Sequence, residues 1–116
     1  MRSLEFYRTA GGGCPVEEFL DSLSDSDARK VAWVLRLVER FDMVPGQYLK
    51  KLVGTEGIWE IRVRTGRMNC RFLGFYETPT LLVLTGGFSK KQDRIQRREI
   101  DLAIRRRTEH MWRKKQ

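Results

Sequence analysis

The sequence contains few of the residues that build metal centres and disulfide frameworks. Its 116 residues include only two cysteines, Cys14 and Cys70, and one histidine, His110. The cysteines have no CxxC spacing and no histidine cluster near them, which indicates small apolar residues in a reducing compartment. His110 lies among arginines near the carboxyl end, so we interpret it as part of a polar, frayed helix terminus without a catalytic role. We therefore expect no metal and no cofactor.

Long apolar segments are also missing. Residues 1–5 lack the apolar run of a signal peptide. The least charged stretch, residues 78–89, is far too short to span a bilayer. These absences exclude a membrane-spanning protein, and we expect a cytoplasmic one.

Positive charge is what the chain has in excess. Twenty-three Lys and Arg against fifteen Asp and Glu give a net charge of +8 and a pI near 10.0. Such a chain attracts polyanions, so RNA, DNA or an acidic protein are the expected partners. Its length and its 41% hydrophobic content suit one modest core. We expect a single domain over residues 1–116, with a basic tail at about residues 105–116.

Hydrophobic periodicity and turn residues predict an α+β fold. The expected strands are residues 4–8, 58–64, 68–76 and 81–88. The expected helices begin at Pro15, after a cap at Ser24, and after a cap at Asp93 with Gln96. Short connections predict an antiparallel meander for the last three strands. The order β-α-α-β-β-β-α indicates helices covering one face of a small twisted, mainly antiparallel sheet, with the other face open.

The predicted hairpin over residues 58–73 alternates apolar and charged residues. If Gly66 takes the first central position of a type II′ turn, Thr65 pairs with Met68 and Arg62 falls opposite Arg71. One face then carries Trp59, Ile61, Val63, Cys70 and Phe72, and the other carries Glu60, Arg62, Arg64, Asn69 and Arg71. Three like charges in contact range destabilise a sheet, so we expect this face to bind an anion.

Glu60 and the arginines beside it suit the cleavage of RNA. A 2′-hydroxyl attacks its adjacent phosphate when a base removes the proton and cations stabilise the phosphorane, so no metal or protein nucleophile is needed. Glu60 is the available base, and Arg62 and Arg71 can grip the phosphate bidentately. The alternative is a solvated sheet face with a Glu60–Arg62 ion pair.

Further basic and aromatic residues follow the last strand and end the chain. Phe88 can stack on a base and Lys90 and Lys91 can attract phosphate, although a core phenylalanine beside solvated lysines gives the same pattern. The basic tail either binds a nucleic-acid backbone or complements the helix dipole. Trp33 and Trp59 are expected in the core, whereas Trp112 suits a contact with a partner.

Taken together, these motifs resemble the RelE/HigB-like toxins of bacterial type II toxin–antitoxin modules, particularly their phage-derived branch. The resemblance rests on residues 48–52, 57–64 and 87–91, with Arg71, Glu99, Ile100 and Ala103. It implies a compact microbial-ribonuclease-like fold. It also implies an endoribonuclease that enters the ribosomal A site and cuts messenger RNA without a metal.

The resemblance assigns roles by position. Glu60 falls at the general base, Arg62 and Arg71 at phosphate-binding and transition-state cations, and Lys90 or Lys91 at a further cation. The expected catalytic residues are Glu60, Arg62, Arg71 and Lys91. The expected RNA-binding residues are Lys50, Lys51, Arg64, Phe88, Lys90, Arg105 and Arg106. The chain departs from the family at two positions: Cys70 stands where an aromatic residue before the hairpin arginine is common, and Gln96 replaces a frequent proline. No histidine or tyrosine near Lys91 offers a general acid.

The resemblance also implies partners. These are the ribosome, messenger RNA and a cognate helix-turn-helix antitoxin. The toxin would contact promoter DNA only indirectly, through that antitoxin. Two alternatives share the fold: a ParE-like inhibitor of DNA gyrase that does not cleave RNA, and a non-catalytic RNA-binding relative.

Overall fold

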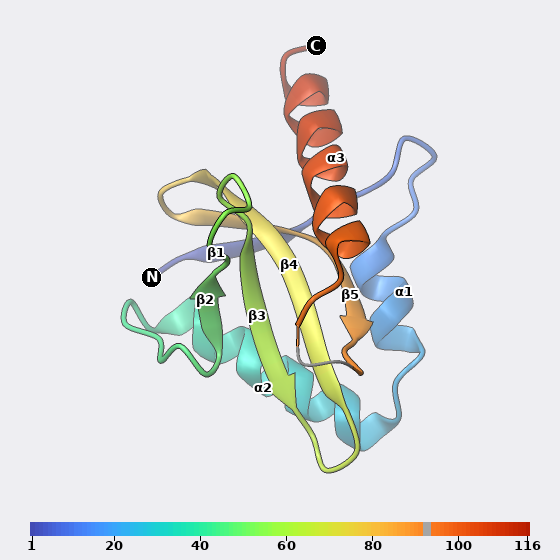
Figure 1. Cartoon of the computed structure of the whole chain (residues 1–116), viewed down its shortest axis with the longest axis vertical. Coiled ribbons are helices and arrows are strands. Elements are labelled where there is room, and N and C mark those ends of the chain that lie inside the picture. Colours follow the sequence, from blue (N-terminus) through green and yellow to red (C-terminus); the bar gives the residue numbers. More distant parts are fainter. Residues whose placement is uncertain (92–93) are drawn as a thin grey trace.

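Residues 1–91 and 94–116, which the computed structural model describes, form a five-stranded sheet and three helices (Figure 1). The strands are β1 (Ser3–Phe6), β2 (Leu49–Lys51), β3 (Trp59–Arg64), β4 (Asn69–Thr78) and β5 (Leu81–Ser89). The helices are α1 (Pro15–Asp21), α2 (Asp25–Arg40) and α3 (Arg97–Lys114). The sheet order is β1-β5-β4-β3-β2, and every pairing is antiparallel except the parallel pairing of β1 with β5. The predicted α+β class is confirmed. No helix in the described part of the chain is long and apolar enough to cross a membrane.

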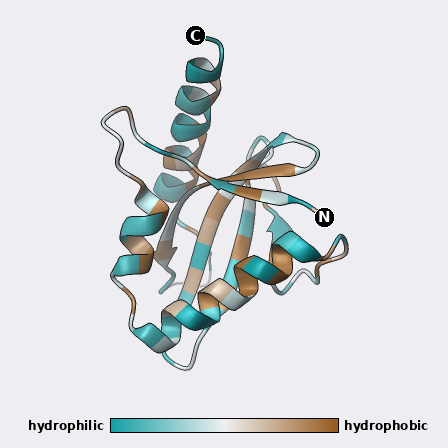
Figure 2. Cartoon of the chain, turned by 180° about the vertical axis from the view of Figure 1, so that it is seen from behind, coloured by the Kyte–Doolittle hydropathy of each residue, from teal (hydrophilic) through white to brown (hydrophobic). Residues whose placement is uncertain are grey.

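The helices lie on both faces of the sheet, so the expectation of one covered face is wrong. α2 lies behind the sheet in Figure 1 and faces the viewer in Figure 2, whereas α3 lies on the other side. α1 and α2 pack against β-strand residues such as Phe72 in one core, while Ala103 of α3 packs against Leu73 and Phe75 in a second core. The charged face of the hairpin thus becomes apolar further along β4, and there the apolar stripe of α3 is buried.

β2 is a strand where the sequence analysis expected only a basic link. Leu49 is buried, Lys50 pairs opposite Glu60, and Lys51 pairs opposite Trp59. Residues directly opposite in a sheet share a face. Lys50 therefore lies on the face of Glu60, and Lys51 lies on the other face.

The register of the β3–β4 hairpin is confirmed, but the turn type is wrong. Arg62 pairs with Arg71, and the Thr65 amide donates to the Met68 carbonyl at 2.9 Å. Gly66 does not have a positive φ, as a type II′ turn would require. Instead, Thr65 Oγ1 accepts hydrogen bonds from the amides of Arg67 (3.3 Å) and Met68 (3.0 Å). A hydroxyl closes this turn in place of a left-handed glycine.

The helix starts follow the predicted caps in part. The Asp27 amide donates to Ser24 Oγ at 3.2 Å, which confirms the cap of α2. Gln96 takes the N-cap position of α3 without a side-chain cap bond, and Asp93 lies outside the described residues. Trp33 is 45% exposed, so its expected place in the core is wrong, whereas Trp59 packs partly buried against the core.

Candidate active site

Glu60 lies between two arginines on the face of the sheet that the hairpin was expected to present. Its Oε1 is 3.6 Å from Arg62 Nε, and its Oε2 is 3.3 Å from Arg71 Nε. β3 supplies Glu60 and Arg62 at alternate positions, and β4 supplies Arg71 directly opposite Arg62. The carboxylate therefore balances the repulsion between two guanidinium groups that the register brings together.

This cluster is buried, which corrects the expectation of an open charged face. Glu60 is 5% exposed and Arg71 6%, while the Arg62 side chain is 34% exposed. Arg71 Nη1 also donates to the Cys70 carbonyl at 3.1 Å. Burial lowers the pKa of the Arg71 guanidinium, Glu60 opposes that shift, and Arg62 and Arg64 add to it. Charges are retained in such a site only when they are paired.

The pairing inside the cluster is incomplete. Although 3.3 Å separates them, Glu60 Oε2 and Arg71 Nε do not meet in hydrogen-bond geometry, and neither atom has another hydrogen-bond partner among the described residues. Nearly all buried polar atoms in folded proteins are hydrogen-bonded, so two orphans facing each other require an explanation. The ionic attraction between the two atoms across 3.3 Å compensates part of this loss.

A hollow of about 270 Å³ gives Glu60 access to solvent. Its wall includes Glu60, Arg62 and three further cationic side chains, and the described residues that line it are Lys50, Leu52, Val53, Thr55, Glu60, Arg62, Lys90, Arg94, Ile95 and Ile100. Lys90 and Arg94 reach the hollow from the segment that joins β5 to α3. Among the described residues, the hollow thus combines one carboxylate with four cations, which suits a phosphate beside a proton that is to be removed.

The cations predicted after β5 line two adjoining hollows. Lys90 lines both the hollow of Glu60 and an adjoining hollow of about 290 Å³, whereas Lys91 is exposed and lines only the adjoining hollow, with Phe88. Arg94 lines both hollows and was missed by the sequence analysis. Arg94 lies in an irregular segment without hydrophobic periodicity, so only its positive charge could have indicated from the sequence that it belongs to the site. Phe88 stands opposite Arg71 in the sheet and packs partly buried against the core under α3.

The arginines of the C-terminal helix have different surroundings. Arg105 is exposed, but Arg106 Nη1 donates to the Thr85 carbonyl at 2.9 Å and its guanidinium lies 5.7 Å from the centre of the Tyr7 ring. Arg107 donates to the Glu56 carbonyl. Arg106 and Arg107 therefore fasten α3 to the rest of the molecule, and Arg105 is the one with an exposed side chain.

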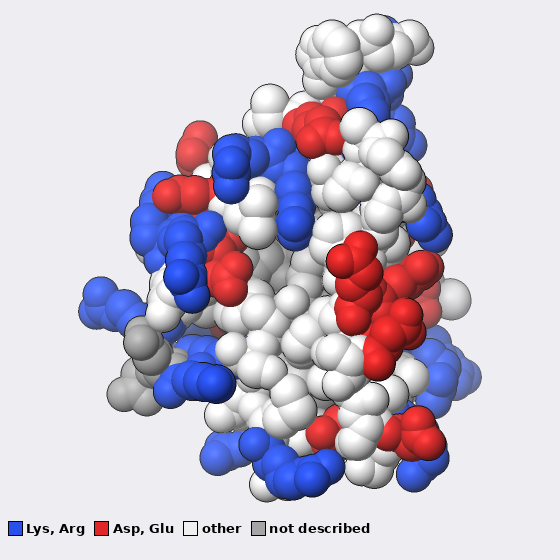
Figure 3. Space-filling view, turned by 90° about the vertical axis from the view of Figure 1, so that its right-hand side faces the viewer, with Lys and Arg blue, Asp and Glu red and all other residues white. Residues whose placement is uncertain are grey.

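One side of this basic molecule carries a cluster of acidic side chains. Figure 3 shows the side on which α1 lies, where Asp and Glu side chains gather next to a hollowed, mostly uncharged surface and Lys and Arg lie around its edges. A hollow of about 370 Å³ lies here between α1, β5 and α3, and Glu18 and Glu99 line it. Because this hollow carries carboxylates beside Arg106, the cationic hollows around Arg62 are better candidates for binding a polyanion.

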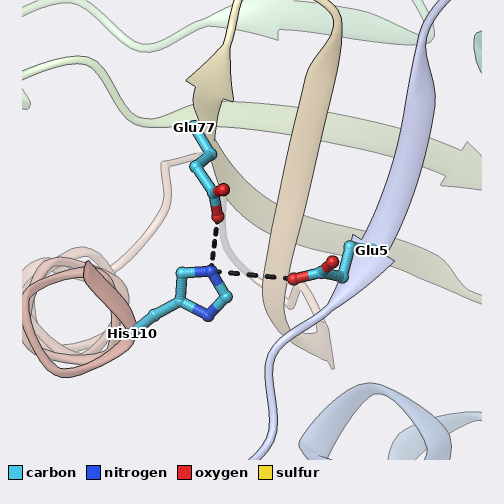
Figure 4. A group of neighbouring side chains, drawn as sticks. All are labelled: Glu5, Glu77 and His110. Carbon is cyan, nitrogen blue, oxygen red and sulfur yellow. Dashed lines mark hydrogen bonds and ion pairs between the residues drawn. The ribbon is translucent and has the colours of Figure 1, made fainter. Parts of the chain in front are cut away.

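His110 is buried and paired, and our interpretation of it as part of a frayed terminus is wrong. It is 8% exposed, and its Nε2 is 2.6 Å from Glu77 Oε1 and 3.6 Å from Glu5 Oε2 (Figure 4). Ligand atoms of these three residues lie within 4.8 Å of one another, which is a spacing that a metal ion can bridge. However, Lys114 Nζ lies 3.6 Å from Glu77 Oε2, so one of the two carboxylates already faces a lysine. We interpret the group as a clamp that holds α3 to β1 and β4.

Comparison with known proteins identifies the family. The sequence profile of the family described as Phage derived protein Gp49-like (DUF891) matches residues 18–108, which span every candidate site residue named above from Lys50 to Arg106. Comparison with curated proteins gives no significant match. The chain belongs to the phage-derived Gp49-like family, which is a family of type II toxin–antitoxin toxins of the RelE/HigB type.

Proposed function

We propose that this toxin is a ribosome-dependent endoribonuclease that stops translation by cutting messenger RNA. The observation that carries the proposal is the buried Glu60 carboxylate between Arg62 and Arg71, with unsatisfied atoms, at the wall of a cationic hollow. Family membership supports a toxin with an antitoxin partner. The reaction, the ribosome and the helix-turn-helix nature of that antitoxin belong to the proposal.

In this mechanism the RNA supplies its own nucleophile. Glu60 removes the proton of a 2′-hydroxyl, and the 2′-oxygen attacks the adjacent phosphorus. Arg62 and Arg71 stabilise the negative charge that develops on the phosphorane oxygens. The bond to the 5′-oxygen breaks, which leaves a 2′,3′-cyclic phosphate on one fragment and a 5′-hydroxyl on the other.

The leaving 5′-oxygen needs a proton as that bond breaks. Lys50 and Lys90 line the same hollow as Glu60, and an ammonium group can donate a proton there. Lys91 would act from the neighbouring hollow by attracting the RNA backbone.

Purified toxin added to translating ribosomes with a defined message tests the proposal. We expect cuts within the translated region, detected by primer extension, which are lost with Glu60→Gln. The same preparation should leave DNA gyrase supercoiling unchanged. Intact message with inhibited gyrase would instead support a ParE-like toxin, and intact message with retained RNA binding would support a non-catalytic relative.

A further inference from the structure

A second cationic hollow lies on the other side of Arg62. It measures about 330 Å³ and is lined by Lys30, Gln47, Tyr48, Arg62, Arg64, Asn69 and Arg71. Four of these seven described residues are cations, two are amides and none is a carboxylate. Such a lining offers many hydrogen-bond donors and a positive potential to an anion.

This hollow is continuous with the candidate active site because the two share a wall. Arg62 lines both hollows, and Arg71, which pairs with Glu60, lines the second one. A strand of RNA whose phosphate lies on Arg62 and Arg71 therefore has its neighbouring nucleotide beside Arg64 and Lys30. Successive phosphates of a single strand are close enough for such adjacent cationic sites to hold them.

The α2 side of the hollow adds an aromatic surface. Trp33 is 45% exposed, and its ring meets the Tyr48 ring edge-on, with centres 6.1 Å apart and planes at 76°. Lys30 Nζ lies 4.8 Å from the centre of the Trp33 ring. An exposed tryptophan held in place by a second ring and bordered by a cation has the chemistry of a base-stacking platform.

We propose that Lys30, Trp33 and Tyr48 form a nucleotide subsite that binds the RNA residue next to the scissile phosphate. The Lys30 ammonium binds the backbone phosphate, and the base stacks on the Trp33 ring, which Tyr48 holds in place through an edge-on contact. The inference rests on the proposed ribonuclease function and extends it, since it defines the direction in which the RNA leaves the active site, across β3 toward α2.

The subsite can be observed without catalysis. The three tryptophans, Trp33, Trp59 and Trp112, each give one indole N–H signal in a two-dimensional NMR spectrum, and Trp33→Phe assigns the relevant one. The probes are a 2′-O-methyl dinucleotide and a hexanucleotide, which cannot be cleaved by 2′-hydroxyl attack. We expect the hexanucleotide to shift the Trp33 signal strongly, and the dinucleotide to shift it as well, because one of its two residues adjoins the phosphate held by Arg62 and Arg71.

Substitutions at the subsite measure how much each side chain contributes to the affinity for RNA. Trp33→Ala should weaken hexanucleotide binding about 5- to 150-fold, the range that corresponds to stacking of one base. Lys30→Ala should weaken binding and make its salt dependence shallower by about 0.7 in log–log slope, the value for one phosphate contact on a single strand. Arg36→Ala is the matched control because it removes one positive charge from the exposed surface of the same helix without lining the hollow.

The outcomes separate the subsite from the proposed function. If the hexanucleotide binds in an Arg71-dependent manner but leaves the Trp33 signal unmoved, and if Lys30→Ala matches Arg36→Ala, the subsite is overturned and the ribonuclease proposal stands. If neither oligonucleotide binds and no message is cut, both fail together. A Trp33 signal that moves only on addition of the antitoxin overturns the subsite in favour of a protein contact.

Discussion

Glu60 is the residue on which the proposed chemistry depends most directly. Glu60→Gln keeps the shape of the side chain and removes the base, so cleavage should fall while RNA binding persists. Single-turnover cleavage and oligonucleotide affinity, measured on the same preparations, separate the two effects. Full activity of the folded variant would show that another group takes the proton.

Arg71 should affect both stability and rate, because it is buried and paired. Arg71→Ala removes a transition-state cation, for which a loss of about 100- to 1,000-fold in rate is typical. It also leaves the buried Glu60 carboxylate with only the partly exposed Arg62, at a cost of about 1–3 kcal/mol in the free energy of unfolding.

A double-mutant cycle with Glu60→Gln tests whether that cost comes from the ion pair. The double variant should be less destabilised than the sum of the two single variants. Additive losses in urea unfolding would mean that Arg71 stabilises the fold through packing alone.

Only those residues of the site that lie on one face of the β3–β4 hairpin could be predicted from the sequence, through the alternation of side chains along a strand. Alternation placed Glu60, Arg62 and Arg71 on one face, and the structure confirms that register. Burial could not be predicted, because it depends on how the cluster folds together in three dimensions. Arg94 and the pairing of His110 were missed for a related reason, since both depend on where irregular or distant segments return to the sheet.

At the scale of elements, the sheet leaves no room for a side chain at certain glycines. A Cβ on Gly74 would lie 2.4 Å from the backbone oxygen of Val83 in the adjacent β5, whereas a Cβ on Gly66 in the hairpin turn meets nothing within 4 Å. Gly74→Ala should therefore force the two strands apart, at a cost of about 1–3 kcal/mol. Gly66→Ala is the matched control and should be neutral or stabilising by up to about 1 kcal/mol. Equal unfolding free energies for the two variants would contradict this packing argument.

The position of α3 should depend on the clamp formed by Glu5, Glu77 and His110. His110→Ala leaves the largely buried Glu77 carboxylate short of a partner, so it should cost about 1–3 kcal/mol in unfolding free energy. Trp112→Ala, two residues further along the same helix and 62% exposed, should stay within about 0.5 kcal/mol of the parent. Hydrogen exchange of α3 amides would rise only in the first variant. If both variants behave alike, the clamp does not hold the helix.

Long elements were predictable from the sequence and short ones were not. α2 has several turns of apolar periodicity and a serine cap, so its start was clear. β2 has three residues, too few for an alternation pattern, and its pairing with β3 is a long-range event. On one face of β4 the side chains change from charged, at Arg71, to apolar, at Leu73 and Phe75, and α3 covers the sheet where they are apolar.

At the scale of the whole molecule, the excess of positive charge is arranged rather than uniform. Cations line the two hollows on either side of Arg62, while acidic side chains gather on the side of α1. A polyanion is therefore attracted toward the two cationic hollows rather than toward the acidic cluster. The distribution of charge thus affects both how fast a polyanion meets the protein and in which orientation it meets it.

The stability of the whole molecule should fall at alkaline pH. Burial raises the pKa of Tyr7, and its hydrogen bond to Glu109 Oε2, at 2.9 Å, and the charge of Glu109 raise it further. Burial also raises the pKa of the Cys70 thiol, with Asp27 adding to the shift. Both groups therefore hold their protons more tightly in the folded protein. Their contribution to stability is complete below the unfolded pKa values of about 8.5 for cysteine and 10 for tyrosine, and it is lost as the pH rises through and beyond them.

Urea unfolding at a series of pH values from neutral to strongly alkaline measures this loss, and Tyr7→Phe isolates the tyrosine. The variant should be less stable at neutral pH by about 1–3 kcal/mol, because the hydrogen bond to the Glu109 carboxylate is gone. It should also lose less stability than the parent above the tyrosine range, because a phenylalanine has no proton to release. A parent curve that stays flat to strongly alkaline pH, or a Tyr7→Phe curve parallel to it, would mean that the buried phenol does not couple folding to proton release.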